Sequence, residues 1–167
     1  MNDPEDRTRF ELGMLYRALD SRRLRRRLTW ADAAAVIGLP LQTVQSTRTA
    51  AKMDADAVLA MVRWLGLPPE TFVRPERDGP IPEYMEADTV WQVDPAILHA
   101  RLAEVRGARG LSWKAVASAL GEGISAASLI RLETGGRVSI QLLAAAADWL
   151  DLPMVTFTRV APGRVVR

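Results

Sequence analysis

Apolar residues in the second half of the chain recur every three or four positions, which predicts a series of short helices. Leu98, Leu102 and Val105 have this spacing in the segment that begins with Asp94-Pro95. Asp is a favoured N-cap, and Pro is favoured at the first helical position. Three further helices are predicted to begin after Ser112, Ser125 and Ser139, with glycines at Gly110, Gly121 and Gly135 ending the helices before them, and "LPMVTF" as a short final turn. No stretch shows the alternation of a strand, so the pattern predicts an all-α fold.

The first half of the chain repeats this pattern. With a shift of 83 residues, "LYRALDSRRLRRRLTWADAAAVIG" lies over "LHARLAEVRGARGLSWKAVASALG". After an insertion at Glu122 and Gly123 the shift becomes 85, and "VRWLGLPPETF" lies over "ADWLDLPMVTF". Residues related by these shifts are called counterparts below; they include Trp30 and Trp113, and Trp64 and Trp149. Thr29, Pro40 and Asp54 are the matching helix starts. The repeat predicts two copies of one unit, at residues 8–73 and 94–158.

Residues 74–93 join the two predicted units. This segment contains three prolines and several acidic residues and has no helical period, so it is predicted to be a linker. Trp91 within it is expected to dock on one of the units. As a flexible chain of this length the linker spans roughly 25 Å.

Composition excludes several classes of chemistry. Cysteine is absent and His99 is the only histidine, so there is no thiolate nucleophile, no cysteine–zinc site and no constellation typical of an enzyme. Because His99 is the counterpart of Tyr16, a structural role in a helix is expected for it. The start "MNDPEDRTRF" is unlike a signal peptide, and the longest apolar runs are shorter than the roughly 20 residues of a membrane span. A cytoplasmic protein without cofactor, metal or membrane partner is predicted.

Basic residues are concentrated in two zones. Residues 17–52 carry eight basic and two acidic side chains, and residues 101–137 carry six and three, whereas the whole chain has a net charge of only +2. The densest run is "SRRLRRRLTW", with five arginines in six positions. Two basic zones separated by acidic segments predict two surfaces that face a polyanion.

The second predicted unit resembles the Cro/C1-type helix-turn-helix domain, or XRE family. The resemblance rests on "GLSWKAVASALGEGISAASLIRLETGGRVSIQLLAAAADWLDLPMVTF", with a Leu-Ser start of the second helix, a glycine that ends it, a serine-capped third helix and the tail "RLETGGR". The first unit matches through the internal repeat but departs from the family pattern, since Arg48 and Ala50 replace the Glu and Gly of Glu133 and Gly135. The resemblance implies two tandem lambda-repressor-like helix-turn-helix domains of four or five helices, the first one degenerate.

In the resembled family the third helix lies in the major groove and contacts base edges. The implied base-reading residues are Gln42, Thr43, Gln45 and Ser46 in the first unit, and Ala126, Ala127, Ser128 and Arg131 in the second. Gln suits adenine, Arg suits guanine and Ala suits a thymine methyl group, so the two units are expected to recognise different sequences. The implied phosphate-binding residues are Arg22, Arg23, Arg25, Arg26, Arg27, Thr29, Lys52, Arg106, Arg109, Ser112 and Arg137. Both units carry Trp where the family often has a phosphate-binding Gln.

The predicted function is sequence-specific binding of double-stranded DNA by a transcriptional regulator, specifically a repressor, from a bacterium or phage and located on the nucleoid when bound. Two different units predict an asymmetric site, and half-sites one turn apart, about 34 Å, are within reach of the linker. The alternative is a protein-interaction or dimerisation module, binding a toxin, a sigma factor or a second copy of the chain, in which one or both units no longer contact DNA.

Overall fold

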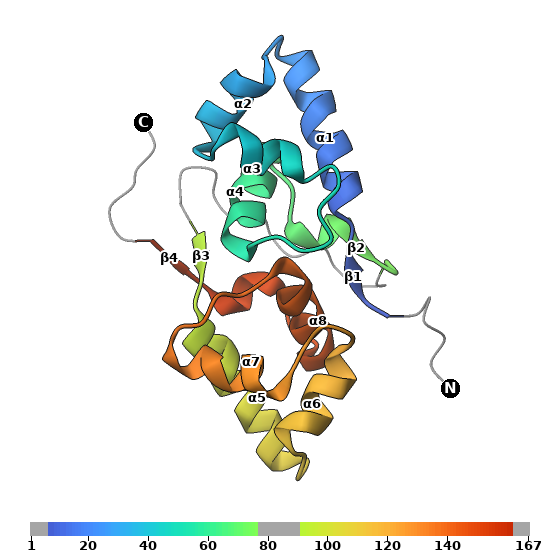
Figure 1. Ribbon diagram of the computed structural model, residues 1–167, viewed down its shortest axis with the longest axis vertical. Coiled ribbons are helices and arrows are strands. Elements are labelled where there is room, and N and C mark those ends of the chain that lie inside the picture. Colours follow the sequence, from blue (N-terminus) through green and yellow to red (C-terminus); the bar gives the residue numbers. More distant parts are fainter. Residues whose placement is uncertain (1–6, 77–90, 162–167) are drawn as a thin grey trace.

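The computed structural model describes residues 7–76 and 91–161, which contain eight α-helices and two pairs of short strands (Figure 1). The first half (residues 9–74) has the order β1 (Arg9–Phe10), α1 (Leu12–Arg25), α2 (Trp30–Ile37), α3 (Leu41–Ser46), α4 (Ala55–Leu65), a 3₁₀ turn (Pro69–Phe72) and β2 (Val73–Arg74). The second half (residues 91–160) has the order β3 (Trp91–Val93), α5 (Pro95–Ala108), α6 (Trp113–Leu120), α7 (Ala126–Arg131), a 3₁₀ turn (Leu132–Thr134), α8 (Ile140–Leu150), a 3₁₀ turn (Met154–Phe157) and β4 (Thr158–Val160). Apart from one extra 3₁₀ turn, both halves have the same order of elements.

Side-chain caps begin most of these helices, as the sequence predicts. The Thr29 hydroxyl accepts the backbone N–H of Asp32, and the Asp32 carboxylate accepts the N–H of Thr29 at 3.0 Å, which completes a capping box at α2. These hydrogen bonds from the Thr29 hydroxyl and backbone hold the pKa of Asp32 below its ordinary value. The other predicted side-chain caps, Asp54, Asp94, Ser112, Ser125 and Ser139, all accept a backbone N–H, whereas Pro40 begins α3 without one.

The expectation that the fold has no strands is wrong. β1 pairs antiparallel with β2, and β3 pairs antiparallel with β4, so each strand pair joins the two ends of one half. The strands are two or three residues long, too short for an alternating pattern to show in the sequence. Trp91–Val93 therefore packs with the second half rather than serving as linker, and Trp91 lies against the hydrophobic core as expected. The rest of the predicted linker, residues 77–90, lies outside the described residues.

Counterpart residues build the core of both halves. Leu15 and Leu19 of α1, and their counterparts Leu98 and Leu102 of α5, are fully buried. Phe72 and its counterpart Phe157 close the two cores from the 3₁₀ turns. The buried residues of both halves form one continuous cluster, because α8 packs against α4 and β1 at the centre of the molecule (Figure 1). Over the described ranges, no helix has the length and apolar character needed to cross a membrane.

Candidate nucleic-acid interface

In the second half, α6 and α7 form a helix–turn–helix pair. The Ser112 hydroxyl accepts the N–H of Ala115 at the start of α6, and the helix ends at Gly121. A second capping box fixes the start of α7, where Ser125 and Ser128 each accept the other's backbone N–H. Leu129 is fully buried and anchors α7 to the core. The opposite face of α7 is consequently held rigidly towards solvent.

The exposed face of α7 differs in part from the predicted set. Ala127 and Arg131 are exposed, whereas Ala126 and Ser128 are half-buried. The Ser128 hydroxyl donates to the Ser125 carbonyl at 2.7 Å, so the capping box already uses it. Ile130, which is not among the residues predicted from the sequence, is 47% exposed. The internal repeat carried the signal for it, because Ile130 is the counterpart of Gln45.

In the first half, α2 and α3 form the matching pair. Gln42, Gln45 and Ser46 are exposed on α3, and Thr43 is half-buried. The Ser46 hydroxyl donates to the Thr43 carbonyl at 2.8 Å, which leaves the two glutamines as the most freely available hydrogen-bonding side chains on this face. Gln carboxamides can donate and accept at one adenine edge.

The arginine run at the end of α1 divides into two classes. Arg25, Arg26 and Arg27 are exposed, whereas Arg22 and Arg23 are half-buried. Arg23 forms an ion pair with Asp20, donates to the Leu28 carbonyl at 3.0 Å, and stacks over the indole of Trp30 at 4.8 Å. These contacts hold the turn between α1 and α2 in place.

The second half builds the same turn from counterpart residues. Arg106 donates to the Leu111 carbonyl at 3.0 Å and lies 4.9 Å over the ring of Trp113. Trp113 also stacks on His99 at 5.2 Å, and in the first half Tyr16 stacks on Trp30 at 5.0 Å. The packing role for both tryptophans and the structural role for His99 follow from these stacks. Arg22 and Arg109 lie over the rings of Trp64 and Trp149.

The remaining predicted phosphate ligands lie at different places. Thr29 and Ser112 are exposed N-caps whose hydroxyls already accept a backbone N–H. Lys52 is exposed and its ammonium group lies beside Gly123, in the turn that leads into α7 of the other half. Arg137, the counterpart of Lys52, is exposed and lines a hollow of about 150 Å³ between the halves.

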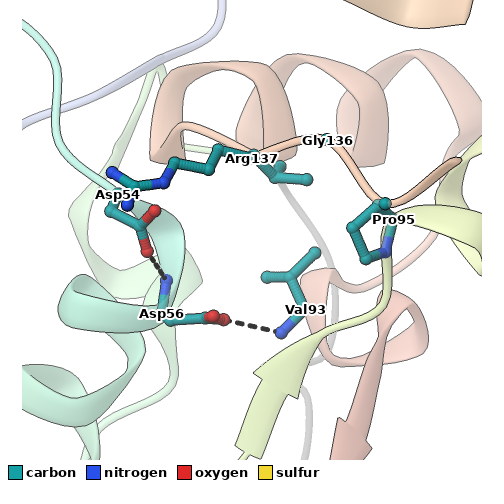
Figure 2. Close-up of a pocket in the computed structure, with 8 residues that line it drawn as sticks. Asp54, Asp56, Val93, Pro95, Gly136 and Arg137 are labelled. Atoms are coloured by element: carbon teal, nitrogen blue, oxygen red, sulfur yellow. Dashed lines mark hydrogen bonds between the residues drawn. The ribbon is translucent and has the colours of Figure 1, made fainter. Parts of the chain in front are cut away.

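Figure 2 shows this hollow, which Asp54, Asp56 and Arg137 line. The Asp56 carboxylate accepts the backbone N–H of Val93 at 2.7 Å. Burial raises the pKa of Asp56 above its ordinary value; the nearby Asp54 carboxylate raises it further, while the Val93 N–H and Arg159 oppose the shift. Over the described part of the chain, no three metal-ligating side chains are grouped.

The family model described as "Helix-turn-helix" matches residues 102–157, from within α5 to the end of the last 3₁₀ turn. The second half of the molecule therefore holds one helix-turn-helix domain of the Cro/C1 type, the class of domain that DNA-binding transcription regulators carry. The match includes α6 and α7, the pair whose caps and exposed face are described above. Neither a comparison with curated proteins nor one with solved structures gave a match to this chain.

Proposed function

We propose that this protein is a sequence-specific regulator of transcription that binds double-stranded DNA, and that it acts as a repressor. The observation that carries the proposal is the helix-turn-helix match over α6 and α7, with Arg131 and Ala127 exposed on α7. Arg131 suits the O6 and N7 acceptors of guanine in the major groove. Ala127 and Ile130 supply apolar surface for thymine methyl groups. No chemical step and no cofactor are part of the proposed function.

We further propose that the first half is a degenerate copy of the same domain and also contacts DNA. Its order of elements, its capped α2 and its arginine–tryptophan–aromatic stack match those of the second half. Gln42 and Gln45 on α3 differ in chemistry from Ala127 and Ile130 on α7. The two copies are therefore expected to prefer different base pairs, and the preferred site is asymmetric in sequence.

Phosphate binding is assigned chiefly to Arg25, Arg26 and Arg27. These three side chains are exposed at the edge of the α1–α2 turn, where Arg23 donates to the Leu28 carbonyl. Arg22 instead donates to the Leu65 carbonyl at the end of α4. Arg27 has a backbone φ of +56°, in the left-handed region, whereas its counterpart Gly110 has φ +64°. A strained arginine at a position that favours glycine supports a role for its charge rather than for its conformation.

The experiment that tests the proposal is selection of binding sites from random duplex DNA with the full-length protein at moderate salt. We expect a long and asymmetric enriched motif, and a loss of preference at one guanine in the Arg131→Ala variant. That substitution should reduce affinity for the selected site by about 5–100-fold, as for the loss of one bidentate contact. Absence of any enrichment by the folded protein would contradict the proposal.

A protein-interaction module is the second candidate function, and exposed apolar residues favour it. Leu41 at the start of α3 is 39% exposed and Ile130 of α7 is 47% exposed, so each candidate recognition helix carries a large apolar side chain on its surface. Such side chains suit a protein partner as well as a DNA methyl group. Binding to unrelated duplexes at low salt separates the two candidate functions. A DNA-binding regulator should bind them through its phosphate contacts, whereas a protein-interaction module should not bind them.

A further inference from the structure

The two halves contact each other through counterpart residues. The Phe10 N–H donates to the Gln141 side-chain oxygen at 3.0 Å. The Val93 N–H donates to the Asp56 carboxylate at 2.7 Å. Val93 is the counterpart of Phe10, and Gln141 is the counterpart of Asp56, so each half supplies the same donor position and the same acceptor position to the other.

The backbone repeats this reciprocity at the starts of α4 and α8. The Ala55 N–H donates to the Val138 carbonyl at 2.9 Å, and the Ile140 N–H donates to the Met53 carbonyl at 2.8 Å. Ile140 is the counterpart of Ala55, and Val138 is the counterpart of Met53. These bonds flank the antiparallel bridge between Asp54 and Ser139, which are themselves counterparts. An interface in which position i meets j and j meets i is the signature of two-fold symmetry.

The arrangement of helices agrees with this symmetry. In Figure 1 a half-turn about the viewing direction exchanges α1 with α5 and α2 with α6, and it exchanges the pair β1–β2 with the pair β3–β4. α3 passes in front of α4 and α7 passes in front of α5, so both candidate recognition helices are presented to the same side. Two contacts depart from the symmetry. The Gln141 side-chain amide also donates to the Phe10 carbonyl at 3.0 Å, a bond for which its counterpart, the Asp56 carboxylate, has no proton to donate. The Met154 N–H donates to the Glu70 carboxylate at 2.7 Å, whereas Pro69, the counterpart of Met154, has no N–H to donate.

The interface also resists separation of the halves. The halves also share an apolar cluster that continues from one into the other; Leu142 belongs to this cluster and Met53 packs against it. Separating the halves exposes this apolar surface to water, which is unfavourable. The relative position of α3 and α7 is therefore set by a packed interface, and the length of the joining segment does not determine it.

We propose that the two halves bind DNA as one fixed, pseudo-symmetric pair, with one chain covering two half-sites in inverted orientation and at one spacing. This inference rests on the proposed function and adds the geometry of the DNA site. It differs from the expectation in which a flexible linker joins two units and half-sites one turn apart lie within its reach. The two half-sites differ in base sequence, because α3 and α7 expose different side chains. The sugar-phosphate backbones of the two half-sites are nevertheless related by an approximate two-fold axis.

A designed disulfide tests whether the interface persists on DNA. Asp54 and Ser139 form a bridge of the type without direct hydrogen bonds, in which the Cα atoms lie about 4.5 Å apart, within the range that a disulfide spans. The natural chain has no cysteine, so the Asp54→Cys, Ser139→Cys double variant can form a single internal bond. The oxidised and reduced forms of this variant differ only in that bond, so the reduced form controls for the lost caps.

We expect oxidised glutathione to close the bond in the free protein, and the oxidised form to bind the duplexes selected from a random pool as tightly as the reduced form, within about two-fold. Failure of the bond to form in the folded protein overturns the inference, because the interface then does not exist in solution. Loss of binding on oxidation also overturns it, because the halves must then separate on DNA.

A spacing series completes the test. Insertion of about five base pairs, half a helical turn, between the half-sites of the selected duplex should weaken binding at least ten-fold, because the second half then meets the wrong side of the helix. Inverting one half-site should have a similar effect. Equal affinity for all spacings and orientations overturns the inference while leaving the proposed function intact. Failure of the reduced variant and the natural protein to enrich any duplex overturns both.

Discussion

The two halves of the molecule agree in the side chains that hold the fold and differ in those that face solvent. Arg23, Trp30 and Tyr16 form a stack in the first half, and Arg106, Trp113 and His99 form the same stack in the second. By contrast, the exposed run Arg25–Arg27 is matched by Ala108, Arg109 and Gly110. The duplicated stack therefore identifies structural roles, and the diverged exposed positions mark where the surfaces of the two halves differ in chemistry.

The comparison of the two halves also separates structural arginines from exposed ones, a distinction that composition alone does not give. Arg23 and Arg106 are counterparts, and both donate to a carbonyl in the following turn. Arg25 and Arg27 have no basic counterpart and are exposed. Their shared contacts thus account for Arg23 and Arg106 as structure, whereas Arg25 and Arg27 are available for a polyanionic partner.

The largest effect is expected from truncation of the two aromatic residues that close the cores. Phe157→Ala and Phe72→Ala should each lower the free energy of unfolding by about 3–5 kcal/mol, because both rings are buried and leave a cavity. Since the halves share one cluster, each variant should still unfold in a single transition, measured by chemical denaturation followed by circular dichroism. Two separate transitions in either variant would show that the halves are independent.

The next largest effect is expected on DNA affinity from Arg25→Ala, Arg26→Ala, Arg27→Ala in combination. Loss of three phosphate contacts should reduce the magnitude of the slope of log K against log salt concentration by about 2 to 3, where K is the association constant for DNA. It should also weaken binding on the order of 10–100-fold at moderate salt. Titrations at several salt concentrations measure both quantities.

The matched control removes three arginines from the strands, Arg9, Arg74 and Arg159, and so makes the same change in net charge. Its salt dependence should stay close to that of the natural protein. Equal losses in the two triple variants would mean that net charge, rather than the α1–α2 turn, determines affinity.

A smaller effect, of opposite sign for stability and for binding, is expected at Arg27. Arg27→Gly should raise the free energy of unfolding by about 1 kcal/mol, since glycine adopts a positive φ without strain. The same substitution should weaken DNA binding a few-fold. Asp151 is the matched control, with φ +54° where its counterpart Gly66 has φ +70°. Asp151→Gly should also stabilise the fold but leave DNA binding unchanged, and a parallel loss of binding would contradict the phosphate role of Arg27.

The sequence predicts the helices and their caps well because each cap is a local pattern of three or four residues. Ser125, for example, is identifiable from its position before an apolar helix, and the structure confirms it as an N-cap. The strand pairs were missed because β1 and β2 are two residues each and pair across the whole first half. Ile130 was not predicted to be exposed, because apolar residues in a helix are expected to be buried. Its counterpart Gln45 was predicted to contact bases. The reciprocal bonds between halves depend on how the copies dock, which no local pattern encodes.

The smallest effect is expected on the pH dependence of stability from a substitution at Asp56, the interface residue whose counterpart in the second half is Gln141. Since the pKa of Asp56 is raised in the folded state, the folded protein binds a proton more readily than the unfolded chain. Stability is therefore greatest below the unfolded pKa and falls as the pH rises through the folded pKa. Asp56→Asn should remove this dependence and increase stability at neutral pH by less than about 1 kcal/mol, because the carboxylate is partly solvated. Denaturation midpoints measured between acidic and neutral pH give this difference in stability. Gln141→Asn is the control and should leave the pH profile unchanged. An unaltered pH profile in Asp56→Asn would assign the pH dependence to another carboxylate.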